Sequence, residues 1–178
     1  DAGVTAIKAK EHVYYPLLHL SQDARAEAPA RFTPQGLNDG EVQFVRDLVQ
    51  WFHENESPLP GSDSFFFRNE SRGRGLGFFI ADNFFPDFII WFVRPDAQTV
   101  VFVDPKGIRN LGGFDHPKLR FYETIKEVEA RLNAEREDGL PPLTLESFVL
   151  STTPHENVMW NTHSGAGRRS KKDFEDRH

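Results

Sequence analysis

The chain has 178 residues, of which 38% are hydrophobic and 27% charged, with no cysteine and a formal net charge of −6. This composition is typical of a single globular domain with a hydrophobic core. The lack of cysteine excludes disulfides and thiolate metal sites and favours a reducing, cytoplasmic setting. The apolar runs are too short to span a bilayer, so no membrane is expected, and the negative charge argues against a nonspecific basic coat for nucleic acid.

Apolar residues at helical spacing predict a first helix over residues 41–52, with Asn38 as its N-cap. A hairpin turn is predicted at residues 94–97, between the last two of the strands that follow this helix. Four strand-like segments are expected there, at residues 64–68, 77–81, 87–94 and 99–104. Runs of phenylalanine within them indicate a sheet that is covered on both faces.

A second helix is predicted after the strands, with Asp115 as its cap and Pro117 in its first turn. A last strand is predicted at residues 147–151. The apolar stripe of the second helix consists of Phe121 or Tyr122, Ile125, Val128 and Leu132. The order of helix, strands, helix and strand predicts an α/β fold with a mixed central sheet flanked by helices.

Three regions are expected along the chain: an N-terminal extension over residues 1–37 that packs on the core, a core over residues 38–155, and a charged segment over residues 156–178. The charged segment is a candidate boundary to a further domain. The chain begins with Asp1 rather than Met, which indicates a piece of a longer protein.

Residues 99–107 read TVVFVDPKG, an apolar strand that ends in Asp104, Pro105 and Lys106. Side chains alternate along a strand, so Asp104 and Lys106 are expected on the same face. Counted from the centre of the predicted hairpin turn, Asp87 and Asp104 are about equally far out, which places the two acids opposite each other. Facing carboxylates repel unless a cation or a proton lies between them, and hard oxygen ligands suit Mg²⁺ or Mn²⁺.

Glu41 is in line with the apolar stripe of the first helix, so its carboxylate is expected to face the sheet. Three carboxylates would then be balanced by Lys106 and one divalent metal ion. Basic side chains cluster on both sides of these acids, and arginine suits phosphate. The candidates for contacts to a nucleic-acid backbone are Arg68, Arg72, Arg74, Arg109, Lys118 and Arg120.

In this spacing, with Glu41 followed by Pro86-Asp87 and then by the triplet Asp104 to Lys106, the chain resembles the PD-(D/E)xK nuclease superfamily. The segments NDGEVQFVRDL, FFFRNESRGRGLGFF, NFFPDFIIW and VVFVDPKGIRNL resemble the C-terminal nuclease domain of type III restriction-like DEAD/DEAH-box helicase proteins. The likeness covers roughly residues 14–151 and implies a restriction-endonuclease-like sheet.

The resemblance also implies a Mg²⁺-dependent endonuclease that hydrolyses nucleic acid, with DNA as the expected substrate and Mn²⁺ as a substitute metal. Asp87, Asp104, Glu41 and the Pro105 carbonyl would be the metal ligands, and Lys106 would position the attacking water. A helicase or ATPase domain of the same longer chain would be the partner, because no Walker A motif is present in these residues.

Simpler interpretations stay open for each of these residues. Glu41 is also placed to form a capping box with Asn38, and Lys106 to form an ion pair with Asp104. Asp87 could simply begin a strand, and the arginine-rich loop could be a plain connection. A catalytically silent nuclease-like module that binds nucleic acid or a partner is the alternative function, whereas a carboxylate-pair glycosidase would leave Lys106 unused.

Overall fold

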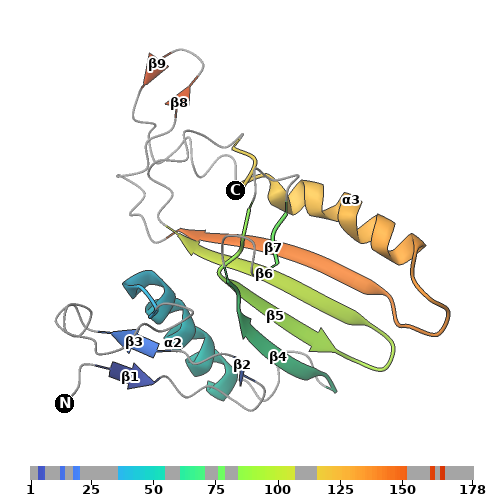
Figure 1. Ribbon diagram of the computed structural model, residues 1–178, viewed down its shortest axis with the longest axis horizontal. Helices are drawn as coiled ribbons and strands as arrows, with labels where there is room; N and C mark the ends of the chain where they lie inside the picture. Colours follow the sequence, from blue (N-terminus) through green and yellow to red (C-terminus); the bar gives the residue numbers. More distant parts are fainter. Residues whose placement is uncertain are drawn as a thin grey trace.

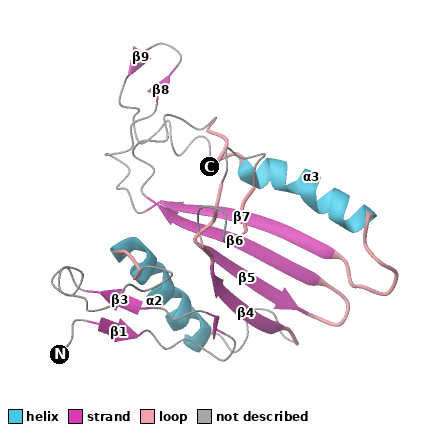
Figure 2. Cartoon of the chain, viewed as in Figure 1, coloured by secondary structure: helices cyan, strands magenta, loops and turns pink. Residues whose placement is uncertain are grey.

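The computed structural model describes residues 36–54, 61–70, 76–78, 84–106 and 116–151, with the backbone alone at Lys106. It also describes the backbone of five short strands nearer the chain ends, and the remaining residues are grey in Figure 2. None of the helices in the described part is long and apolar enough to cross a lipid bilayer. The short strands are β1 (Val4–Ala6), β2 (Val13–Tyr14), β3 (Leu18–Leu20), β8 (Asn161–Thr162) and β9 (Gly165–Ala166).

The predicted order of helix, three strands, helix and strand is confirmed, and the fold is α/β. A five-stranded sheet has the order β2-β4-β5-β6-β7, with antiparallel pairs in its middle and parallel pairs at its two sides (Figure 1). The larger elements are α2 (Asp39–Glu54), β4 (Asp63–Arg68), β5 (Phe88–Val93), β6 (Gln98–Lys106), α3 (Phe121–Ala134) and β7 (Leu143–Ser151).

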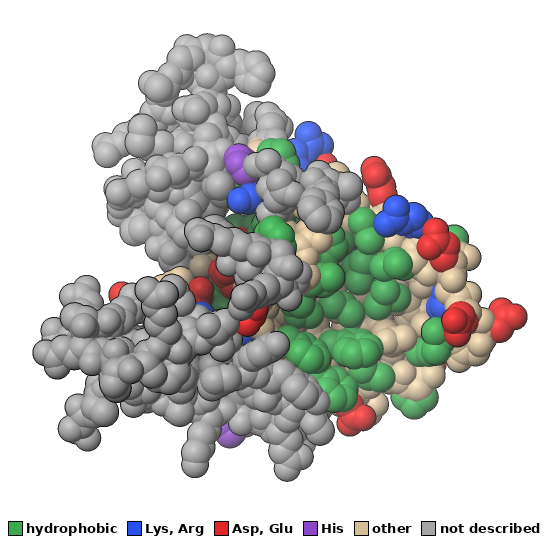
Figure 3. All heavy atoms as spheres, in the orientation of Figure 1, with side chains coloured by type: hydrophobic (Ala, Val, Ile, Leu, Met, Phe, Trp, Pro, Cys, Tyr) green, Lys and Arg blue, Asp and Glu red, His purple; other side chains and the backbone are tan. Residues whose placement is uncertain are grey.

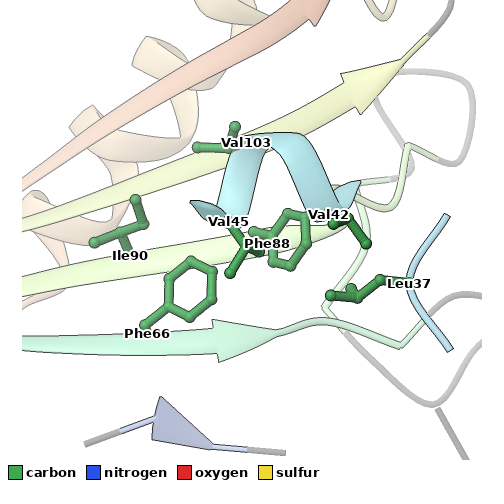
Figure 4. Packing of buried hydrophobic residues seen from close by; sticks show 7 residues of the cluster. All are labelled: Leu37, Val42, Val45, Phe66, Phe88, Ile90 and Val103. Atoms are coloured by element: carbon green, nitrogen blue, oxygen red, sulfur yellow. The ribbon is translucent and has the colours of Figure 1, made fainter. Parts of the chain in front are cut away.

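One face of the sheet packs against α2. Val42 and Val45 of the helix lie over the strands (Figure 4), and both are in one buried cluster with Phe66, Phe88 and Val103. Phe66 and Phe88 are stacked, with ring centroids 5.3 Å apart. Burial of one such side chain contributes about 1.5–3 kcal/mol, so the packing of Val42 and Val45 in this cluster fixes the helix on the sheet.

The other face packs against α3. Phe121 and Ile125 of the helix are fully buried in a second cluster with Phe102 of β6 and Leu145 of β7. Phe102 and Val103 are neighbours in β6 and belong to different clusters, as the alternation of side chains along a strand requires. The prediction of a sheet covered on both faces is therefore confirmed.

The start of the second helix was predicted wrongly. Residues 116–120 form a turn, and α3 begins at Phe121 instead of in the turn that contains Pro117. The side chain of His116 explains the turn, because its Nδ1 accepts a hydrogen bond from the backbone N–H of Lys118 at 3.2 Å. Within the predicted stripe, Phe121 is buried, whereas Tyr122 and Leu132 are exposed. Asp115 lies outside the described residues.

The strand predicted at residues 77–81 is also not a regular strand in its described part. Phe78 forms an isolated antiparallel bridge with Phe84, and residues 79–81 lie outside the described part. Gly77 is needed here, because a Cβ atom at this position would lie 2.3 Å from the ring of Phe85. Two arms of the connection between β4 and β5, residues 76–78 and 84–86, thus approach each other closely.

Candidate functional site

Asp87 and Asp104 lie just beyond the same end of the ladder between β5 and β6. The outermost pair of these antiparallel strands is Phe88 with Val103, so the next positions outward are Asp87 and Asp104. The turn that sets this register is present, with the backbone N–H of Arg94 donating to the carbonyl of Ala97 at 2.9 Å. The register agrees with the sequence prediction up to this end of the ladder, and the facing of the two carboxylates stays a prediction.

The two strands separate at this point. Pairing of β6 with β5 ends at Val103, whereas pairing with β7 continues to Lys106 opposite Ser151. Asp104 is 1% exposed, and a carboxylate removed from water requires compensating charge or hydrogen bonds. In the space-filling view, acidic side chains are visible near the middle of the face, between the apolar surface and atoms drawn in grey (Figure 3).

Pro105 and Lys106 complete β6. Pro105 is buried and lies opposite Leu150 in the parallel ladder with β7. Proline has no N–H, so its place beyond the last pair with β5 removes no ladder bond on that side. Lys106 is the final residue of the strand, and its side chain lies outside the described part. The prediction that its side chain shares a face with Asp104 therefore falls outside the described part.

Glu41 faces the sheet, as its helical phase predicted, and is 8% exposed. Its carboxylate accepts a hydrogen bond from the backbone N–H of Asn38 at 2.9 Å, and its own N–H donates to Asn38 Oδ1 at 2.9 Å. This is the capping box that the sequence left open as an alternative. The same carboxylate oxygen lies 3.6 Å from Nη2 of Arg68.

Arg68 is therefore a buried partner of α2 and not a surface cation. The residue is 8% exposed. Arg68 lies two residues after Phe66 in β4, so both side chains are on the face of the sheet that α2 covers. Burial lowers the pKa of Arg68, and the charges of Glu41 and Asp87 act in the opposite direction. Its Nη1 is buried and has no hydrogen-bond partner among the residues that the structure describes. A direct contact with a nucleic-acid phosphate would require this pair to open.

The described residues hold no group of three or more histidine, aspartate or glutamate side chains that could bind a metal together. Glu41 is thus not gathered with Asp87 and Asp104 into one cluster. The reason is the alternation of side chains: Asp104 follows Phe102 on the α3 face, whereas Glu41 meets Arg68 on the α2 face. A metal ligand set that includes Glu41 stays a prediction.

Of the remaining basic candidates, two lie in the described part of the chain and three lie outside it. Lys118 and Arg120 lie in the turn just before α3. This turn is near the connection that leads to Asp87, because Phe121 at the start of α3 packs against Phe84. Arg120 is held by Glu123, at 2.6 Å from Nη2 to Oε2, and is about half exposed. The predicted phosphate contacts of Arg72, Arg74 and Arg109 lie outside the described residues.

Asn69 contacts the backbone next to the candidate site, and the sequence did not indicate this. It follows β4, and its backbone N–H donates to the carbonyl of Asp87 at 2.8 Å. Its side-chain amide also donates to the carbonyl of Pro86 at 2.8 Å. No local pattern in the sequence indicates these contacts, because the partners lie 17 residues or more along the chain.

Comparison of the chain with protein-family models, with curated proteins and with solved structures found no match.

Proposed function

We propose that this chain is a metal-dependent endonuclease domain that hydrolyses phosphodiester bonds of nucleic acid, with DNA as the expected substrate. The observation that supports the proposal is the register of β5 and β6, which brings Asp87 and Asp104 to the end of the ladder where the two strands separate, with Lys106 two residues beyond the buried acid. The resemblance to the PD-(D/E)xK superfamily assigns these same residues. A restriction or helicase-nuclease protein would be the larger context.

The donor set fits Mg²⁺ better than a metal that needs a closed protein cage. Mg²⁺ keeps several waters and is commonly bound by one or two carboxylates together with phosphate oxygens of the substrate. Asp87 and Asp104 would supply these carboxylates, and the Pro105 carbonyl would be a further ligand. The lack of a three-carboxylate group in the described part is compatible with such a site. When bound, the metal would neutralise charge on the phosphate and acidify a bound water.

The protein's own residues would have distinct tasks. Lys106 would position the attacking water and balance the charge of the two acids. Glu41 is held by Asn38 and Arg68 on the α2 face, so it would act on the site indirectly, by fixing the end of β4 beside Asp87. Lys118 and Arg120 would contact the phosphate backbone of the substrate beside α3, which would position the nucleic acid without reading its bases.

The test is cleavage by the purified 178-residue chain of supercoiled plasmid, single-stranded DNA and RNA, with Mg²⁺, Mn²⁺ or EDTA. The variants are Asp104→Ala and Lys106→Ala. A matched control is Asp96→Ala, because Asp96 lies in the turn at the opposite end of the same hairpin, with a side chain 83% exposed. We expect metal-dependent cleavage that either site variant reduces by about 100-fold or more and that the control retains.

Cleavage that survives both site substitutions would overturn the proposal. The second candidate function is a silent nuclease-like module, which the formal net charge of −6 favours. It predicts nucleic-acid or partner binding with neither metal uptake nor cleavage. The RNA and single-stranded arms of the same experiment identify the substrate class.

A further inference from the structure

The side chain of Asn69 makes three hydrogen bonds to backbone groups of the connection between β4 and β5. Nδ2 donates to the carbonyl of Leu76 at 2.7 Å and to the carbonyl of Pro86 at 2.8 Å. Oδ1 accepts the N–H of Leu76 at 2.9 Å. One amide therefore joins both arms of this connection, residues 76–78 and 84–86, to the end of β4.

The two arms pair with each other shortly before Asp87, the residue that precedes β5. Phe78 and Phe84 exchange backbone hydrogen bonds at 2.7 and 3.1 Å, and Gly77 allows the ring of Phe85 to come close. The backbone N–H of Asn69 donates to the carbonyl of Asp87, and its side chain holds the carbonyl of Pro86. Two consecutive carbonyls at Pro86-Asp87 are thus fixed by a single residue.

We propose that Asn69 is a positioning residue that holds the backbone of Asp87 in place, so that its carboxylate stays opposite Asp104. The inference rests on the proposed function, because it matters only if the two acids act together. The bonds need a side chain that donates and accepts at the same time, which an amide provides and an aspartate does not. Asn69 itself touches neither metal nor substrate in this proposal.

The chain contains a matched control for this experiment. Nδ2 of Asn133 donates to the carbonyl of Leu143 at 2.7 Å, and the N–H of Leu143 donates back to Oδ1 at 2.9 Å. This amide makes the same kind of backbone contact at the opposite end of the sheet, because Leu143 pairs with Gln98, the first residue of β6. Loss of Asn133 removes comparable bonds far from Asp87.

The experiment compares the full chain with Asn69→Ala and Asn133→Ala. Mn²⁺ binding is measured by titration calorimetry, kcat and KM by plasmid cleavage, and stability by urea unfolding. Both variants should unfold at lower urea concentration, because each loses backbone hydrogen bonds. Only Asn69→Ala should weaken Mn²⁺ binding, by about tenfold, as is typical when a supporting partner of a metal ligand is removed. We expect a matching fall in kcat.

Equal Mn²⁺ affinity of Asn69→Ala and the wild type would overturn the inference, since a purely stabilising role predicts that result. If Asn69→Ala does not fold, Asn69→Gln replaces it. Glutamine keeps donor and acceptor but displaces them by one methylene, so it should also weaken Mn²⁺ binding. A wild-type chain that binds no Mn²⁺ and cleaves nothing would instead contradict the proposed function, and the inference with it. The wild-type measurements therefore test the proposed function, and the Asn69 variants test the role of Asn69.

Discussion

Arg68 and Glu41 form a buried ion pair that joins the end of β4 to the first turn of α2. The two atoms Nη2 and Oε2 are 3.6 Å apart, and the side chains are 9% and 11% exposed. The glutamate is also fixed by the capping box with Asn38. The carboxylate of Glu41 therefore caps the N-terminus of α2 and also neutralises the buried guanidinium of Arg68. These two contacts fix α2 relative to the end of β4, next to Asp87.

Replacement of Arg68 by methionine should destabilise the protein by about 3 kcal/mol, because it leaves the carboxylate of Glu41 buried without its cation. Urea unfolding measures the loss. The control is Arg94→Met, since the pair of Arg94 and Asp96 has side chains 40% and 83% exposed. A surface pair of this kind contributes less than about 1 kcal/mol. Equal losses in the two variants would show that the Arg68 pair is no stronger than a solvated one.

Glu129 should make the stability of the protein depend on pH in the acid range. Burial acts to raise its pKa, but the hydrogen bond from the N–H of Leu145 and the contact with Lys126 leave the pKa below its ordinary value. A lowered folded pKa gives a contribution that is complete above the unfolded value of about 4.3 and is lost as the pH falls through the folded one. Glu129→Gln should thus cost about 1 kcal/mol at pH 7 and nothing well below pH 4.

The matched variant for this prediction is Glu146→Gln, which removes the other carboxylate of Lys126. That pair is 2.9 Å long but has side chains 42% and 41% exposed, so water screens it. Urea unfolding should show that Glu146→Gln lowers the free energy of unfolding less than Glu129→Gln does. A pH profile for Glu129→Gln that runs parallel to that of the wild type would refute the assignment.

Much of the fold could be predicted because it depends on local patterns. The apolar alternation of β5 and β6 and the turn at residues 94–97 set the register, which in turn brings Asp87 and Asp104 to the same end of the ladder. The start of α3 could not be predicted from the same kind of pattern. Pro117 suits a first helical turn, but the ring of His116 stabilises a separate turn before Phe121.

The site was harder to predict where it depends on contacts between distant elements. Arg68 was correctly placed at the end of a strand, but its burial beside Glu41 under α2 depends on how the helix packs on the sheet, and its contact with phosphate stays a prediction. Asn69 carries no local sign of its role, because its partners Leu76 and Pro86 come together only when the connection folds back. Contacts of this type are visible only in three dimensions.

The most direct test of the central claim is a crystal of the chain soaked in Mn²⁺ and examined by anomalous diffraction, beside a crystal of Asp104→Asn soaked in the same way. We predict an anomalous peak between the carboxylates of Asp87 and Asp104 in the wild type and none in the variant. A wild-type map without such a peak, or an equal peak in both crystals, would contradict the account.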